Sequence, residues 1–244
     1  MKDMTKGDPL GLILRFAFPL LLGNLLQQFY NLADAAIVGR FLGANALAAV
    51  GATGSVYASA HTVAARINMF AICPFDALCS GTTTFCSQNY GAGDYGRIRE
   101  GVRISIFAAV LYGLTVGTLL VFFGRYACLI FLSADETQIL DAAHMVLRRC
   151  GYAFAVLGLL DVSRAVMQAF GYSGHAMVSG IMEMIARAGV VILFAPRFGF
   201  NAISLADPAA WIAADLYMIP IWILVMRRVK RMLVSRSLRK KPLL

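Results

Sequence analysis

Long apolar segments recur along the sequence, and they restrict the chain to folds that lie in a lipid bilayer. An α-helix needs about 20 consecutive apolar residues to cross the hydrocarbon core. Backbone polar groups must be satisfied within the lipid, and a helix satisfies them inside one segment. The sequence therefore predicts an all-α fold, a polytopic membrane helix bundle of about six transmembrane helices. The six candidate segments are Phe16–Val38, Val56–Ser87, Val102–Phe123, Leu140–Phe170, His175–Phe194 and Pro208–Met226.

The composition excludes the ordinary soluble classes of protein. Of the 244 residues, 59% are hydrophobic and 14% are charged, and the mean hydropathy is +0.71. A soluble domain has about 45–50% apolar and about 25% charged residues. A soluble enzyme, a disordered segment and a disulfide-stapled secreted module are therefore excluded. The five cysteines form no CxxC pair, so we expect unpaired thiols, no metal site and no cofactor.

The positive charge of the chain is concentrated at its C-terminal end. The formal net charge is +9, and eight of the 22 Lys and Arg residues lie between Arg227 and Lys241, where no acidic residue occurs. A basic segment directly after an apolar helix is typical of a cytoplasmic anchor that touches anionic lipid headgroups. Nucleic-acid binding is not expected, because no aromatic stacking pattern accompanies the basic residues.

The loops predict the orientation of the chain. The connection before the third apolar segment carries Arg97 and Arg99, whereas the connection after it carries Asp135 and Glu136. Loops rich in Lys and Arg stay in the cytoplasm. We therefore expect a multi-pass protein of the plasma membrane with both termini cytoplasmic, which requires an even number of spans.

Two glycine-containing motifs resemble catalytic signatures. Residues Gly91–Gly96 match GxGxxG, but a membrane helix precedes them instead of the strand that a dinucleotide site requires. Residues Gly171–Gly174 resemble the GxSG of rhomboid-type intramembrane serine proteases, whose serine needs a histidine from another helix as its base. The sixth apolar segment contains no histidine, and His175 lies only two residues from Ser173. We predict helix-connecting turns and no enzyme, with an intramembrane serine protease as the alternative.

Polar residues recur along the first apolar segment at three- and four-residue spacing. At 3.6 residues per turn they fall within roughly a 120° arc of an otherwise apolar helix. Such a stripe either lines an aqueous cavity, with its single carboxylate able to bind a proton or a cation, or forms a packing seam held by amide hydrogen bonds. The stripe consists of Asn24, Gln27, Gln28, Asn31 and Asp34.

Charged residues also occur inside later segments. Asp161 and Arg164 share one face of the fourth segment, and Glu183 and Arg187 share one face of the fifth. Ionisable groups at this depth usually face a water-filled path or a partner. These four residues are therefore candidates for lining a substrate cavity, unless each pair only neutralises itself within its own helix. Asp215 stands alone on the sixth segment.

Two parts of the sequence resemble the multidrug and toxic compound extrusion (MATE) transporters. Gly7–Thr53, which reads GDPLGLILRFAFPLLLGNLLQQFYNLADAAIVGRFLGANALAAVGAT, resembles the opening of the family's N-terminal lobe. The stretches HTVAARINMFAICPFDAL, SQNYGAGDYGRIREGVR and MQAFGYSGHAM resemble its C-terminal lobe. Family members have twelve helices in two lobes, so the chain resembles an internally deleted member reduced to about one six-helix lobe. On this resemblance, residues 1–55 correspond to the start of the N-terminal lobe, 56–226 to five helices of the C-terminal lobe, and 227–244 to a basic cytoplasmic tail.

The resemblance implies a function. It implies antiport, coupled to H⁺ or Na⁺, that exports amphipathic drugs and toxic compounds, with no cofactor beyond the coupling ion. Asp34 corresponds to the family's first-helix aspartate and is expected to carry the coupling ion, including Na⁺ if that is the ion used. The alternative is a non-transporting remnant, or a half-transporter that is active only as a homodimer.

Overall fold

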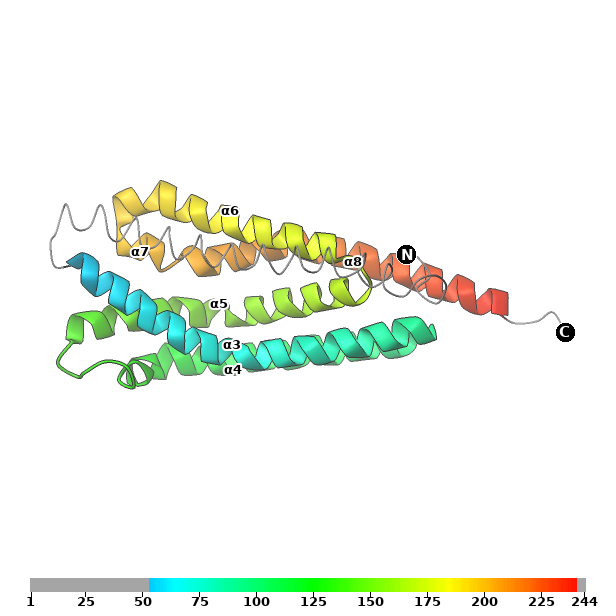
Figure 1. Ribbon diagram of the computed structural model, residues 1–244, viewed down its shortest axis with the longest axis horizontal. Helices are drawn as coiled ribbons and strands as arrows, with labels where there is room; N and C mark the ends of the chain where they lie inside the picture. Colours follow the sequence, from blue (N-terminus) through cyan, green and yellow to red (C-terminus); the bar gives the residue numbers. More distant parts are fainter. Residues whose placement is uncertain (1–52, 241–244) are drawn as a thin grey trace, which may run out of the picture.

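The computed structural model of the protein describes residues 53–240, and five long helices make up nearly all of this part (Figure 1). Each is long and apolar enough to cross a membrane, and residues 53–240 contain no strand. The all-α prediction is therefore confirmed, as are five of the six predicted spans. The remaining predicted span, Phe16–Val38, lies outside the described residues. The long helices are α3 Thr53–Ala92, α4 Tyr95–Cys128, α5 Thr137–Ala169, α6 Ser173–Phe198 and α8 Ala206–Lys240, with the short helix α7 at Phe200–Ile203.

The helix ends differ from the predicted ones where a stop signal is missing. The predicted last span ends at Met226, whereas α8 continues to Lys240, because the Arg, Lys, Leu and Met residues that follow are good helix formers. Asp207, which with Pro208 reads in the sequence as the N-cap and first residue of this helix, is not its N-cap, because α8 begins at Ala206 and Asp207 lies in its first turn. The four-residue helix α7 is too short to give a sequence period.

The two glycine motifs form helix-connecting turns, as predicted. Gly93 has φ +81° between α3 and α4, and Gly171 has φ +80° between α5 and α6. These positive φ values favour glycine, which has no Cβ to clash with the backbone. Asp94 is the N-cap of α4, and its side chain accepts a hydrogen bond of 3.0 Å from the backbone N–H of Arg97.

Helix α5 is the centre of the bundle. In the apolar stretch of α5, 67% of the residues are buried inside the bundle, whereas the corresponding share in the other four spans is 17–33%. Its closest neighbour is α4, where a Cβ added to Gly117 would lie 2.2 Å from the carbonyl oxygen of Gly151. The two backbones are therefore in direct contact, an approach that small residues permit between membrane helices.

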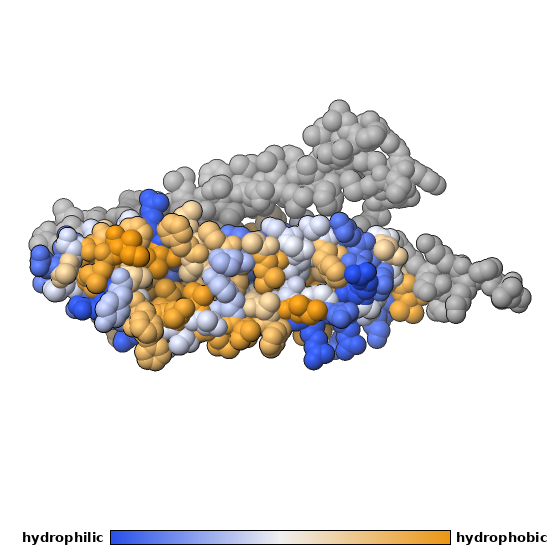
Figure 2. All heavy atoms as spheres, turned by 90° about the horizontal axis from the view of Figure 1, so that it is seen from below, coloured by the Kyte–Doolittle hydropathy of each residue, from blue (hydrophilic) through white to orange (hydrophobic). Residues whose placement is uncertain are grey.

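The surface has the character of a lipid-facing bundle. Large apolar side chains are exposed on the outer faces of the helices, including Phe70, Phe107, Phe122, Leu193 and Leu216. In Figure 2, hydrophilic residues gather toward the two ends of the visible face and apolar residues lie between them. So many exposed apolar side chains would form a large patch in water. The chain is thus a multi-pass membrane protein.

The two ends of the bundle differ in charge. The α3–α4 turn, with Arg97 and Arg99, lies at the same end as the C-terminal half of α8 (Figure 1). We call this the basic end. The α4–α5 connection, with Asp135 and Glu136, lies at the opposite end, which we call the acidic end.

Candidate functional site

Arg164 on α5 joins α5 to α6 through a buried ion pair. Its Nη2 lies 2.7 Å from Oε2 of Glu183, and its Nε donates a hydrogen bond of 2.6 Å to Oγ of Ser179. Ser179 and Glu183 are buried, one turn apart on α6. Asp161, one turn earlier on α5, is 3.9 Å from Nη1 of the same arginine. Two donor groups of one guanidinium therefore hold two positions of the neighbouring helix.

Glu183 also connects to a second arginine, and through it to α8. Its Oε1 lies 3.4 Å from Nη2 of Arg187, and the same Nη2 lies 3.1 Å from Oδ1 of Asp207. Glu183 thus bridges two guanidinium groups, and the interactions run without a break across three helices. We call Asp161, Arg164, Glu183, Arg187 and Asp207 the charged chain.

The geometry shows how the charged pairs are arranged, and whether they line a substrate cavity stays a prediction. Within a helix, Asp161–Arg164 is 3.9 Å and Glu183–Arg187 is 3.4 Å. Between helices, Arg164–Glu183 is 2.7 Å and Arg187–Asp207 is 3.1 Å. The shorter contacts are those between helices, so neutralisation within each helix is not the main arrangement. Sequence spacing shows which residues share a face but not which helix that face meets, so it gave no indication that Asp207 would pair with Arg187.

Two further carboxylates belong to the same region. Asp76 on α3 and Asp215 on α8 lie close enough to Asp161 to act on its charge. Asp215 is 5% exposed, and neither of its carboxylate oxygens has a hydrogen-bond partner among the described residues. Moving a charge out of water costs several kcal/mol unless the charge is paired. A buried carboxylate without a partner is therefore a candidate to bind a proton or a cation.

The region has more acidic than basic groups. Counting residues 53–240 only, five carboxylates and two guanidinium groups give a net charge of −3 when all are ionised. The carboxylates are those of Asp76, Asp161, Glu183, Asp207 and Asp215, and the guanidinium groups are those of Arg164 and Arg187. A negative region inside a membrane protein attracts cations.

The predicted polar stripe cannot be placed beside this region. Asp34, the predicted carrier of the coupling ion, lies outside the described residues, and so does the rest of the stripe. Whether the stripe lines a cavity or forms a packing seam therefore stays open, and its residues remain predictions. They are Asn24, Gln27, Gln28, Asn31 and Asp34.

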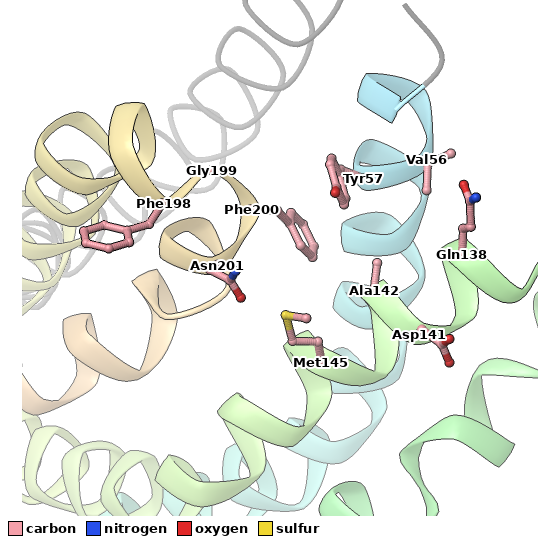
Figure 3. A pocket seen from close by; sticks show the side chains of 10 residues that line it. All are labelled: Val56, Tyr57, Gln138, Asp141, Ala142, Met145, Phe198, Gly199, Phe200 and Asn201. Atoms are coloured by element: carbon pink, nitrogen blue, oxygen red, sulfur yellow. The ribbon is translucent and has the colours of Figure 1, made fainter. Parts of the chain in front are cut away.

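A hollow of about 620 Å³ opens at the acidic end between α3, α5 and the α6–α7 link. Tyr57 of α3 stacks on Phe200 of α7 with ring centroids 4.5 Å apart, and Met145 projects toward them from α5 (Figure 3). Asp141 is the charged side chain among the described lining residues, and it pairs with Arg125 at 3.0 Å. The described lining therefore offers no unpaired charge, and we assign this hollow no role.

Arg149 holds α7 against α5, and no pattern in the sequence indicates this role. Its Nη2 donates a hydrogen bond of 2.9 Å to Oδ1 of Asn201. Its Nη1 donates to the carbonyl oxygen of Asn201 and to Oγ of Ser204. Helix α7 has only four residues and shows no periodic pattern in the sequence. The sequence therefore does not indicate that an arginine on α5 would bind α7.

The serine protease alternative finds no support in the geometry. His175 pairs through Nδ1 with Oη of Tyr217 at 3.1 Å, and Nε2 of His144 lies 3.0 Å from the carbonyl oxygen of Val121. Ser173, at the start of α6, has no side-chain hydrogen bond to either histidine in the described part of the chain. A serine without a histidine partner lacks the base that this chemistry requires.

Comparisons with known proteins point to one family. The family model MatE matches residues 50–193. The chain is 26% identical over 181 residues to the probable multidrug resistance protein YoeA of Bacillus subtilis (strain 168), a match that covers 74% of this chain and 35% of that protein. It is 24% identical over 193 residues to the multidrug export protein MepA of Staphylococcus aureus (strain NCTC 8325 / PS 47), covering 78% of this chain and 39% of that protein. The chain thus spans less than two fifths of the length of these curated relatives.

Solved structures give the same fold. The chain matches a multidrug resistance MATE family transporter of the MOP superfamily in an outward-facing conformation with a TM-score of 0.77 and 17% identity, covering 89% of this chain and 47% of that one. It matches a MATE structure in the bent conformation with a TM-score of 0.76 and 18% identity, covering 95% of this chain and 50% of that one. The fold is thus that of about half of a solved transporter.

Proposed function

The chain belongs to the MATE family of membrane transporters, and we propose that it acts in cation-coupled export of amphipathic, often cationic compounds. The proposal concerns secondary active transport, in which an inward flow of H⁺ or Na⁺ drives the substrate outward. The curated relatives support it through their names, which describe multidrug resistance and multidrug export.

The single observation that carries the proposal is the charged chain with its excess of acidic groups. Ionisable groups in membrane helices are costly and usually mark ion or substrate pathways. Here they extend along the bundle, from Arg164, five residues before the end of α5, to Asp207 in the first turn of α8. A purely structural ion pair would need equal numbers of both signs. The carboxylates of Asp76 and Asp215, which form no ion pair among residues 53–240, favour a pathway for cations.

Competition for one carboxylate couples the two fluxes in this proposal. Asp34 carries the H⁺ or Na⁺, and Gln27 and Asn31 line its site. Binding of the coupling ion cancels the negative charge of Asp34 and so weakens the attraction for a cationic substrate. A ligand can shift a two-state equilibrium only by its differential affinity for the two states. Ion and substrate therefore exchange as the cavity alternates between the two sides of the membrane.

A transport assay in vesicles tests whether the chain exports cationic compounds and whether Asp34 carries the coupling ion. The chain is reconstituted into proteoliposomes, and efflux of a fluorescent cationic dye is followed under an imposed H⁺ gradient and, separately, under an imposed Na⁺ gradient. We expect Asp34→Asn to lower gradient-driven transport at least tenfold. Asp141→Asn is the matched control, because it makes the same chemical change at an exposed pair near the acidic end, and it should transport normally.

Each outcome of this experiment decides something. If the unaltered chain moves dye under neither gradient, the proposed function is wrong for this chain. If Asp34→Asn transports as well as the unaltered chain, the role of Asp34 is wrong while export stands. Cross-linking of the same sample gives the oligomeric state, and a strictly monomeric, inactive species would favour the non-transporting alternative over a homodimer.

The orientation is part of the proposal. We infer that the protein lies in the cell membrane with its basic end and both termini in the cytoplasm, because loops rich in Lys and Arg stay inside. An impermeant maleimide should label Asp135→Cys in intact cells and Ser235→Cys only after permeabilisation. The reverse pattern would invert the topology.

A further inference from the structure

Helix α8 is longer than a bilayer is thick. It has 35 residues, which at 1.5 Å per residue is about 52 Å, whereas the hydrocarbon core measures about 30 Å. The helix must therefore leave the core at one of its ends. Because Asp207 lies in the first turn of α8 at the acidic end, the surplus length emerges at the basic end.

The sequence of α8 fixes the depth at which it emerges. From Leu216 to Met226 the helix has no charged residue, and four of the next five residues are basic. About 20 residues cross the core, which places Arg227 at its boundary if the span begins near Asp207. The headgroup layer adds about 5–8 Å on each side, or roughly three to five residues of helix. Residues 227–231 therefore lie at the depth of the lipid headgroups.

Three of these basic residues share one face. Arg227, Lys230 and Arg231 are spaced three and four residues apart, and together with Val234 and Ser235 they line a hollow of about 470 Å³. The three basic residues are exposed, whereas Val229 and Leu233 are buried on the other side of the helix. We call Arg227, Lys230 and Arg231 the basic face.

The basic face takes part in no ion pair in the described part of the chain. No acidic residue follows Asp215 in the sequence, and none of the ion pairs among residues 53–240 involves the basic face. Arg97, which stacks on Phe85 at 5.8 Å, lies at the same end of the bundle and adds positive charge there. Three cations at headgroup depth that form no ion pair with residues 53–240 attract anions from their surroundings.

We propose that the basic face binds the phosphate groups of anionic phospholipids. Charge complementarity and depth carry the assignment, since guanidinium and ammonium groups are good donors to phosphate and the bilayer supplies phosphate at this level. The inference rests on the membrane location and not on the proposed transport.

Native mass spectrometry of the full chain in detergent micelles tests the proposal. The protein is titrated with dioleoyl-phosphatidylglycerol or dioleoyl-phosphatidylcholine, and retained lipids are counted. Each Lys or Arg near an anionic surface raises affinity roughly fivefold. The triple variant R227Q/K230Q/R231Q should therefore lose at least tenfold in affinity for phosphatidylglycerol. The unaltered chain should retain little phosphatidylcholine.

The matched control is R236Q/R239Q/K240Q, which removes an equal number of positive charges, two Arg and one Lys, further along α8. It should lose less than threefold, because those residues lie beyond the headgroup layer. Equal losses in both triple variants would overturn the proposal and leave only a general charge effect. Displacement of the lipid by millimolar inorganic phosphate would overturn the choice of a membrane lipid as the ligand.

A charge-conserving variant separates binding from folding. R227K/R231K keeps the positive charges and should retain at least half of the phosphatidylglycerol affinity, with an unchanged melting temperature. If this variant loses the lipid while its fold is intact, the proposal is overturned, because positive charge at headgroup depth would then not be sufficient to bind the phosphate group.

Discussion

Replacing Glu183 by glutamine should destabilise the bundle more than any other removal of a single negative charge in the charged chain. Glu183 is 7% exposed and contacts two guanidinium groups, at 2.7 Å and 3.4 Å. Removing one partner of a buried pair costs about 3–5 kcal/mol, because the other charge stays buried. Glutamine keeps one oxygen acceptor, so we expect a loss of about 2–3 kcal/mol. For a chain of this size about 1 kcal/mol corresponds to 2–4 °C, which gives a fall in Tm of roughly 5–10 °C.

The measurement is thermal unfolding of the purified chain in detergent micelles. Asp141→Asn is the matched control: it removes a carboxylate from an ion pair of similar length, 3.0 Å, whose side chains are 50% and 67% exposed. Exposed pairs contribute about 0–1 kcal/mol, so its Tm should change by less than about 4 °C. A double-mutant cycle of Arg164→Gln and Glu183→Gln should give a coupling of about 1–3 kcal/mol. Additive effects, or equal Tm losses for Glu183→Gln and Asp141→Asn, would refute the reasoning.

Three further predictions follow from the packing and the hydrogen bonds. Gly117→Ala places a Cβ 2.2 Å from a backbone carbonyl oxygen of α5 and should cost about 1–3 kcal/mol, whereas Gly180→Ala has nothing within 4 Å and should be neutral or stabilising in the same thermal unfolding assay. Arg149→Ala removes the hydrogen bonds that hold α7 and should speed proteolysis between residues 199 and 205; the exposed neighbour Arg148 supplies the control, and equal proteolysis of both alanine variants would contradict the role of Arg149. Asp215→Asn removes a buried carboxylate without a hydrogen-bond partner and should raise Tm by a few degrees; a lower Tm would show that the ionised carboxylate stabilises the fold.

The positions of the spans could be predicted because each apolar segment carries its own signal. The chain must satisfy its backbone hydrogen bonds within each helix, so length and hydropathy locate a helix without knowledge of its neighbours. The same reasoning found both turns, since Gly93 and Gly171 interrupt helical segments at positions with φ > 0. It missed α7, because four residues between Gly199 and Ser204 show no period.

The partners of the charged residues could not be predicted in the same way. Spacing placed Arg164 beside Asp161 on one face, and that contact exists, but Glu183 is the closer partner and comes from another helix. Which faces meet depends on how closely two helices approach and at which level. In this bundle part of that information lies in small residues such as Gly117, which a pattern of polar residues does not include.

The contact between Gly117 and Gly151 also has a mechanical consequence. Where two backbones are in contact, neither helix can slide along the other without a steric clash, so α4 and α5 behave as one rigid unit. Helix α6 packs mainly along α8 and only sparsely along α5. The ion pair between Arg164 and Glu183 connects α6 to the rigid unit of α4 and α5. An ion pair tolerates a displacement of about an ångström at little cost, whereas touching backbones do not. If the bundle deforms during a transport cycle, α6 will therefore shift relative to α4 and α5, and the displacement will be taken up by the ion pairs of the charged chain.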